Sequence, residues 1–207
     1  GRAARALTAC SGIVPTVLIV DGPAVSGPAL LLGIADHVVM TEAAYAFVSG
    51  PTMVAEFTGV VIDNDELGGA ASHGRYSGSA SLVTATVAEA IEAAELLLAY
   101  FPQHNDEEPP RWPTDDDVER LIPQAGELLP ASSNGSYDVR EVIRALADDG
   151  DLLEMRPRWA TNVVTAYVTV GGMPAGGVAN QPLALAGTVD IRASQKAARV
   201  VSNCDAV

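Results

Sequence analysis

A turn of small residues joins two strongly apolar segments near the start of the chain. Residues 16–21, TVLIVD, form a short apolar run rich in β-branched side chains, which is typical of a buried strand. The sequence GPAVSGPA (22–29) follows, and Pro28 suits the first turn of a helix over 28–35. A second strand is predicted at 37–41. A buried strand that leads through a tight turn into a helix and another strand indicates an α/β fold.

Strands and helices continue to alternate up to about residue 101. We expect strands at 44–48 and 81–85, and short helices at 52–57 and from Asp63 to Gly68-Gly69. Thr86 and Glu89 then form a capping box that opens a longer helix. The helical period predicts one apolar side of this helix, made of Val87, Ile91, Ala94 and Leu98.

The composition changes between residues 102 and 136. This stretch is rich in Pro, acidic residues and Ser, which is typical of a linker. We expect Trp112 and Leu121 to lie on a neighbouring surface and to order part of it. The sequence therefore predicts a first α/β unit over 1–101, a linker over 102–136 and a second α/β unit over 137–207.

The second unit is expected to open with a helix that Gly150 ends. The predicted apolar face of this helix consists of Val139, Val142, Ile143 and Leu146. A strand at 162–170, a glycine-rich turn from Gly171 to Gly177 and the return strand GVAN indicate a hairpin. A last helix over 194–204 is expected to turn Ala197, Val201 and Cys204 inward.

The composition argues against several classes of protein. The formal net charge of −14 disfavours general nucleic-acid binding, and no apolar run approaches the roughly 20 residues of a membrane span. Two isolated cysteines, Cys10 and Cys204, do not make a disulfide framework, and no apolar leader is seen. We therefore expect a cytoplasmic protein. Because the chain lacks an initial Met and ends in a helical pattern without a stop signal, we expect a fragment.

Few residues are arranged for acid–base or metal chemistry. Ser26 lies between a strand and a helix, as in a nucleophile elbow, but AVSGP is not G-x-S-x-G. The spacing selects no partner for it among His37, His73 and His104. No His or Cys pair has ligand spacing, so no metal is predicted. The turn 22–29 does offer unhindered backbone N–H groups that could bind an oxyanion, although helix–sheet packing explains the same residues.

Five stretches, in order, resemble the biotin-dependent carboxyltransferases, the β subunits of acyl-CoA carboxylases such as propionyl-CoA carboxylase. They span residues 11–40 with D-x-V-V-M, 44–59 with AYAFVSGP, 66–83 with ELGGAASH, 137–182 and 185–207. The resemblance covers almost the whole chain. It implies a crotonase-like ββα superhelix, with the later part of an N-terminal carboxyltransferase domain over 1–101 and the early part of a C-terminal one over 137–207.

The resemblance also implies a catalytic turn. Ser26 and Gly27 match the family's Gly-Gly pair, whose N–H groups would face the thioester oxygen of an acyl-CoA. The family has Gly and Ala where this chain has Ser26 and Pro28. A positive φ would cost Ser26 more than glycine, and Pro28 is expected to restrict Gly27 to extended conformations.

Further residues are assigned by the same resemblance. Ala24 and Val25 would line the acyl end of the substrate. The F-V-T-G-P segment, expected near the pocket, is matched by Phe47, Ser49, Gly50 and Pro51. The residues that match the third motif are expected to be mainly structural: His73, Ser77 and Gly78.

The implied activity is transfer of a carboxyl group from carboxybiotin, carried on another subunit, to a short-chain acyl-CoA. The released biotin nitrogen can take the α-proton, so the protein need only stabilise enolate-like oxyanions and hold the partners together. The implied partners are the acyl-CoA, a biotin-carrying α subunit and further β subunits in a homo-oligomer. The family's second oxyanion turn, for the biotin carbonyl, lies beyond the position of Val207, so we expect the fragment alone to be inactive.

Three alternatives remain. A biotin-dependent acyl-CoA decarboxylase would share nearly every motif. A crotonase-type hydratase or isomerase is disfavoured because no Glu stands in or just after the glycine turn. A non-catalytic fragment that binds CoA or supports assembly would belong to a different class.

Overall fold

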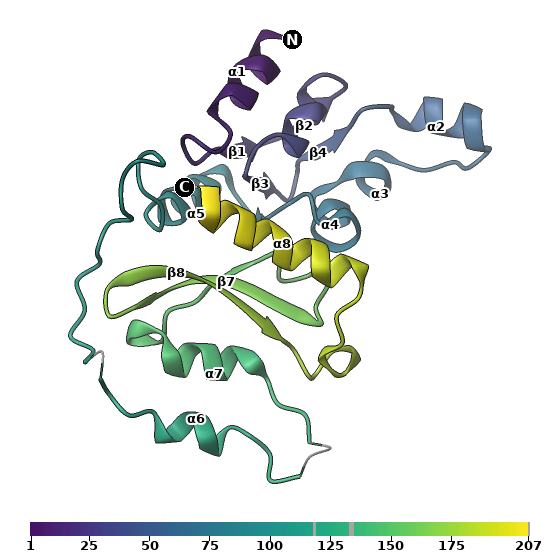
Figure 1. The fold of residues 1–207 in the computed structure, drawn as a ribbon. Coiled ribbons are helices and arrows are strands. Elements are labelled where there is room, and N and C mark those ends of the chain that lie inside the picture. Colours follow the sequence, from purple (N-terminus) through teal and green to yellow (C-terminus); the bar gives the residue numbers. More distant parts are fainter. Residues whose placement is uncertain (118, 133–134, 207) are drawn as a thin grey trace. The chain divides into compact units, whose positions relative to one another are not determined.

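The computed structural model describes residues 1–117, 119–132 and 135–206 (Figure 1). The chain forms two compact units, Gly1–Leu98 and Ala99–Val207, so that the acidic stretch 102–136 belongs to the second unit. Within the described ranges, every helix is too short or too polar to cross a membrane.

In the first unit, the chain twice forms a strand of one sheet, then a strand of a second sheet, and then a helix. Strands β1 (Val17–Val20), β3 (His37–Thr41) and β5 (Leu82–Thr84) form a parallel sheet in the order β1-β3-β5. Strands β2 (Pro23–Val25) and β4 (Tyr45–Phe47) form a separate parallel pair. The chain thus runs from β1 through β2 into the 3-10 helix η1 (Pro28–Gly33), and from β3 through β4 into α2 (Pro51–Thr58). This is a repeated ββα succession.

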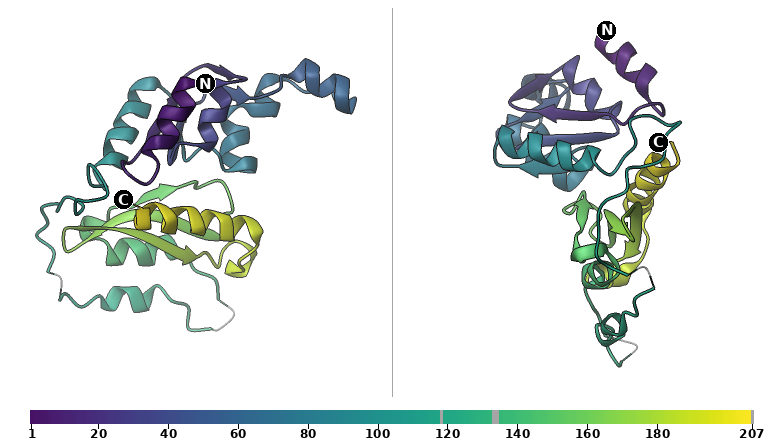
Figure 2. Two further views of the ribbon diagram at one scale, coloured as in Figure 1. Left: turned by 45° about the horizontal axis from the view of Figure 1, so that its top comes forward. Right: turned by 90° about the vertical axis from the view of Figure 1, so that its left-hand side faces the viewer.

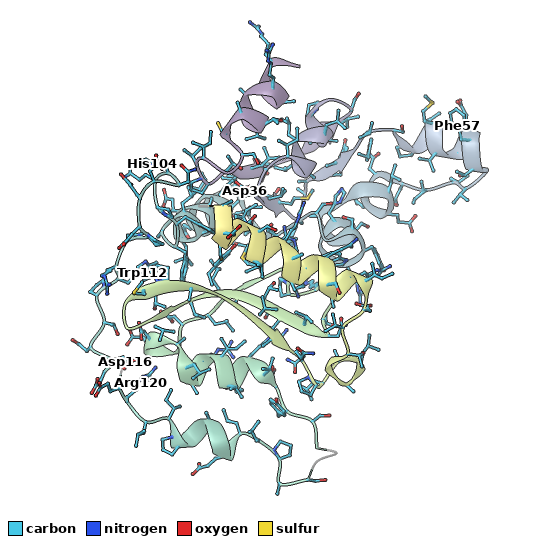
Figure 3. The ribbon with its side chains drawn as sticks, viewed as in Figure 1. Asp36, Phe57, His104, Trp112, Asp116 and Arg120 are labelled. Atoms are coloured by element: carbon cyan, nitrogen blue, oxygen red, sulfur yellow. The ribbon has the colours of Figure 1, made fainter. Side chains whose placement is uncertain are left out.

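The core of the first unit forms around β3, in which every residue is buried. Buried apolar side chains from neighbouring elements pack with it, including those of Val20, Leu32 and Ala46. The starts of β1 and β3 are tied together by Asp36 (labelled in Figure 3), whose carboxylate accepts hydrogen bonds from the N–H (2.8 Å) and hydroxyl (2.6 Å) of Thr16. The predicted strands are confirmed here, because short apolar, β-branched runs have few other ways to be buried.

The remaining helices of the first unit are α1 (Arg2–Cys10), α3 (Asn64–Gly68), α4 (Ala70–Ser72), the π-helix η2 (His73–Ser77) and α5 (Val87–Leu98). The capping box is confirmed on one side, since Thr86 Oγ1 accepts the Glu89 N–H at 3.2 Å, while the Glu89 carboxylate accepts from Ala85 instead. The predicted apolar side of α5 is not the side that the structure buries. Its buried residues are Ala90, Ala94 and Leu97, whereas Val87, Ile91 and Leu98 are exposed.

The second unit is an antiparallel sheet with helices packed on its long strands (Figure 2). Its strands are β6 (Leu153–Met155), β7 (Val163–Val170) and β8 (Met173–Asn180), with β7 in the centre. Both α7 (Val139–Leu146) and α8 (Ile191–Ala206) contact β7, which is buried at every residue except Val170. The predicted long turn is wrong, because Gly171 and Gly172 alone make it, both at positive φ as a type I′ hairpin requires.

The inward face of α8 differs from the prediction by one residue. Its buried residues are Ala193, Lys196 and Val200, while Val201 and Cys204 are exposed. A lysine interrupts the apolar pattern, yet its Nζ lies 2.9 Å from the carbonyl oxygen of Trp159 and 2.8 Å from that of Val163. These carbonyls satisfy the buried ammonium group.

The acidic stretch is partly ordered by Trp112 (labelled in Figure 3). Its N–H donates to the Gly172 carbonyl at 2.8 Å, and its indole N–H donates to the Ala99 carbonyl at 3.1 Å. The matching expectation for Leu121 is wrong, because that side chain is 90% exposed. The stretch also contains α6 (Pro123–Glu127), and the chain continues into α7, η3 (Asp148–Gly150) and, after β8, η4 (Leu185–Gly187).

The predicted apolar face of α7 is only partly buried. Val139 is enclosed, but Leu146 at the end of the helix is half-exposed. Asp138 caps the helix by accepting the Arg140 N–H at 3.0 Å.

Candidate functional site

The structure brings two of the predicted site segments together at the ends of neighbouring strands. Strand β2 pairs with β4 in parallel, so that Ala24 lies opposite Ala46 and Val25 opposite Phe47. The turn that follows β2 and the turn that follows β4 therefore leave the same edge of the pair. The carboxyl edge of parallel strands is where α/β folds commonly bind ligands.

Ser26 occupies the left-handed region of backbone space, with φ of 63°. This geometry costs serine more than it would cost glycine. Its N–H donates to the Phe47 carbonyl oxygen at 2.8 Å. Ser26 therefore ties the two turns together through its backbone.

The conformation of Gly27 contradicts the prediction. Its φ of −54° and ψ of −48° are helical rather than extended. Pro28 disfavours this conformation for a residue with a Cβ, but glycine has none to clash with the proline ring. Gly27 caps η1, its carbonyl accepts the Leu30 N–H at 3.2 Å, and a Cβ added to Gly27 would meet open space.

The residues after β4 form a second small-residue turn. Phe47 is half-buried and stacks on Tyr45, with ring centroids 5.5 Å apart. Ser49 is exposed, Gly50 is the cap of α2 and Pro51 is its first residue. Pro51 suits this position because the first N–H of a helix has no intrahelical partner.

Residues of the ELGGAASH motif (66–73) contact the backbone of β4 and of the residue before it. A Cβ on Gly68 would lie only 2.2 Å from the Ala46 carbonyl oxygen, so only glycine allows this approach. The Ala70 N–H donates to the Ala44 carbonyl at 3.0 Å, and His73 Nε2 lies 2.7 Å from the Ala46 carbonyl oxygen. The motif ELGGAASH therefore has a structural role, which is to hold the backbone of β4 in place.

The remaining predicted residues differ in exposure. Ala24 belongs to the core, whereas Val25 and Ser26 are exposed. Both ring nitrogens of His73 are engaged, Nε2 by Ala46 and Nδ1 by Ser77 Oγ at 2.9 Å. Neither ring nitrogen of His73 is therefore left to act as a base for Ser26. Among the described residues, no three His, Cys, Asp or Glu side chains are grouped to hold a metal ion.

Sequence reasoning missed two contacts that build this site. The Ser26–Phe47 hydrogen bond and the His73–Ala46 hydrogen bond each join residues more than twenty positions apart. The motifs identified the residues, but their pairing depends on which strands become neighbours.

Comparison with known proteins identifies the family. The Carboxyl transferase domain family matches residues 1–207, and the chain belongs to it. The expected crotonase-like α/β fold is confirmed by the crystal structure of transcarboxylase 12S with hydrolysed methylmalonyl-coenzyme A bound. That structure superimposes with a TM-score of 0.94 at 37% identity, covering 98% of this chain and 39% of the other.

Two relatives are similar over nearly the whole chain. The propionyl-CoA carboxylase beta chain of Roseobacter denitrificans is 39% identical over 197 residues, 95% of this chain. The methylmalonyl-CoA decarboxylase subunit alpha of Veillonella parvula is 34% identical over 200 residues, 96% of this chain. The chain spans 39% of the length of each.

Proposed function

We propose that the chain is part of the carboxyltransferase component of an acyl-CoA carboxylase, acting on a short-chain acyl-CoA. The observation that carries the proposal is the pairing of β2 with β4, which sets the turn at Gly27 beside the turn at Ser49–Pro51. Family membership supplies the reaction class.

The proposed role of the Gly27 turn is to stabilise an oxyanion. Removing the α-proton of an acyl-CoA places negative charge on the thioester oxygen, and a fixed N–H donor stabilises that charge. The Ser26 N–H already donates to Phe47. Of the proposed catalytic pair, Gly27 therefore offers the donor, while Ser26 sets the direction of the turn.

The neighbouring residues are proposed to bind the substrate. Val25 is exposed beside the turn, and the half-buried Phe47 ring lies on the next strand. Ala24 would act from the core beneath them, and Ser49, Gly50 and Pro51 would form the opposite wall. Carboxybiotin on a partner subunit would supply the carboxyl group, and none of the described residues is assigned to it.

The proposed assembly includes a biotin-carrying α subunit and further copies of the β subunit. The solved transcarboxylase 12S relative is described as a hexamer with a substrate bound to a multienzyme core. The compartment proposed for this assembly is the cytoplasm.

The test of the donor role compares two glycines of the same short helix. A leucine in place of Gly27 or Gly33 keeps its N–H and meets open space. At position 27, however, Pro28 disfavours the helical conformation of a residue with a Cβ, so the N–H of Gly27→Leu should turn away from the substrate. We expect the unchanged chain and Gly33→Leu to bind propionyl-CoA equally in isothermal titration, and Gly27→Leu to bind at least about tenfold more weakly. Equal binding by Gly27→Leu would refute the donor role, and absence of binding by the unchanged chain would refute the site.

A decarboxylase is the second candidate, favoured by the similarity to the Veillonella subunit. Both activities would use the same oxyanion turn, because carboxylation and decarboxylation pass through the same enolate. The complete gene product should be assayed with its biotin-carrying partner in both directions. ATP-dependent carboxylation of propionyl-CoA would support a carboxylase. Release of CO2 from methylmalonyl-CoA without added nucleotide would support a decarboxylase. Binding without turnover in either direction would indicate a non-catalytic role.

A further inference from the structure

His73 begins a local irregularity next to the proposed site. It is the first residue of η2, a turn of π-helix that runs from His73 to Ser77. Single π-helical turns inside helices are rare and are frequent at functional sites. The turn places Ser77 Oγ 2.9 Å from His73 Nδ1.

The hydrogen bonds of His73 define its tautomer. A carbonyl oxygen can only accept, so the contact of 2.7 Å with Ala46 requires the proton on Nε2. In the neutral ring, Nδ1 then accepts from the Ser77 hydroxyl. The ring is therefore fixed from both sides, with its N–H directed at strand β4.

The Ala46 carbonyl lies one peptide before the carbonyl that binds Ser26. Ala46 is buried, and Gly68 packs closely against its carbonyl oxygen. A buried carbonyl that loses its donor carries a free-energy penalty and tends to rotate toward another one. Rotation of this peptide would also displace the Phe47 carbonyl, which accepts the Ser26 N–H.

We propose that His73 is a positioning residue, which holds the end of β4 so that Phe47 fixes Ser26 and the Gly27 N–H keeps its direction. The path runs from Ser77 through His73 and Ala46 to Phe47 and Ser26. The importance of His73 for catalysis rests on the proposed function of the Gly27 turn. Its effect on the structure of the turn does not rest on that function, because this effect concerns only how rigidly Ser26 is held.

The test compares His73→Gln with His73→Leu in the 207-residue chain. Glutamine can place an amide N–H near the position of Nε2, whereas leucine has similar bulk and no donor. His104→Leu is the matched control, since His104 belongs to the second unit and pairs with Glu107 at 3.1 Å. The two readouts are amide hydrogen exchange at Ser26 and the affinity for propionyl-CoA.

We expect His73→Leu to speed exchange at Ser26 by about tenfold and to weaken propionyl-CoA binding by a similar factor. Both should return to near the unchanged values in His73→Gln, and His104→Leu should alter neither. If His73→Leu does not fold, Ser77→Ala decides, because it keeps the Nε2 donor but frees the ring. Ser77→Ala should then speed exchange at Ser26 by about threefold.

Unchanged exchange at Ser26 in His73→Leu, or in Ser77→Ala where that variant decides, would overturn the inference. So would failure of His73→Gln to restore it in a folded protein. If the unchanged chain does not bind propionyl-CoA, the proposed function fails, while exchange at Ser26 still decides the role of His73.

Discussion

The Ser26 N–H donates to the carbonyl oxygen of Phe47 across a distance of 2.8 Å. This bond joins the turn after β2 to the turn after β4, although the residues lie 21 positions apart in the sequence. It also explains why the chain tolerates a serine at positive φ, since the hydrogen bond and the parallel pairing of the two strands oppose relaxation of the turn.

Replacing Ser26 with glycine should stabilise the protein. A left-handed conformation costs a residue with a Cβ roughly 1–2 kcal/mol, and glycine removes this cost. Glycine also has more entropy in the unfolded chain, which offsets about 0.5–1 kcal/mol of that stabilisation. Ser26→Gly should therefore raise the free energy of unfolding by about 0.5–1 kcal/mol in urea denaturation. Ser26→Ala, which keeps the Cβ at this exposed position, is the control and should stay within about 0.5 kcal/mol of the unchanged chain. A Ser26→Gly variant less stable than Ser26→Ala would contradict the strain.

Replacing Gly68 with alanine should destabilise the first unit. The added Cβ would lie 2.2 Å from the Ala46 carbonyl oxygen, and the backbone atoms on both sides cannot simply move apart. We expect a loss of about 1–3 kcal/mol in the free energy of unfolding. Gly33→Ala is the control, because its Cβ meets open space, and it should be neutral or stabilising by up to about 1 kcal/mol. Equal stability of the two variants would argue against the close packing of Gly68 on β4.

The strands were predictable because a short apolar run has a single dominant way to be buried in an α/β fold. The buried faces of the helices were harder to predict. Helix α5 carries Ala, Ile, Leu or Val on every side, so its period does not select between the predicted Ile91 side and the buried side at Ala90 and Leu97. In α8, the predicted inward residues did not include Lys196, whose burial depends on the carbonyls of Trp159 and Val163, more than thirty positions away in the sequence.

The candidate site shows the same division. Its residues could be assigned from the resemblance, because the motifs stand in order along the chain. Its geometry could not, because the Ser26 N–H bonds to Phe47 across the strand pair and Gly27 is helical despite the proline that follows it. The expectation of an extended Gly27 applied the rule for residues with a Cβ to the one residue without it.

The carboxylate of Asp148 should make stability depend on acid. Asp148 is buried, which alone raises the pKa of its carboxyl group. This is outweighed by hydrogen bonds from the N–H groups of Gly172 and Gly171, by the Thr169 hydroxyl and by the charge of Arg120, so the pKa lies below its usual value. Because the folded pKa is below the unfolded value of about 3.9, the stabilisation is complete above pH 5 and is lost as the pH falls through the folded pKa.

Asp148→Asn is the variant that isolates this effect. The amide offers one acceptor oxygen to two N–H groups, so we expect a loss of about 1.5–3 kcal/mol at pH 7, measured by urea denaturation. The difference from the unchanged chain should shrink as the pH approaches 3. Asp149→Asn, at an exposed neighbour, should lose less than about 0.5 kcal/mol at either pH. A loss that is independent of pH would contradict the assignment to the Asp148 charge.

Replacing Lys196 with methionine should destabilise the second unit although it removes a buried charge. The Lys196 ammonium donates to the carbonyls of Trp159 and Val163, and methionine would leave them without this donor. We expect a loss of about 1–3 kcal/mol at pH 7. Arg192→Met, which removes an exposed cation of the same helix, is the control and should change stability by less than about 0.5 kcal/mol.

The pH dependence of this loss has a definite sign. Burial lowers the pKa of Lys196 to about 8, with the charges of Arg140 and Arg156 adding to the decrease and that of Glu154 opposing it. Since the unfolded value is about 10.4, the unfolded chain binds more protons between pH 8 and pH 10, and the unchanged protein gains stability over that range. Lys196→Met lacks this gain, so its deficit should grow from pH 8 to pH 10. A deficit that shrinks over the same range in urea denaturation would show that the charged form, and not burial, dominates the energy of Lys196.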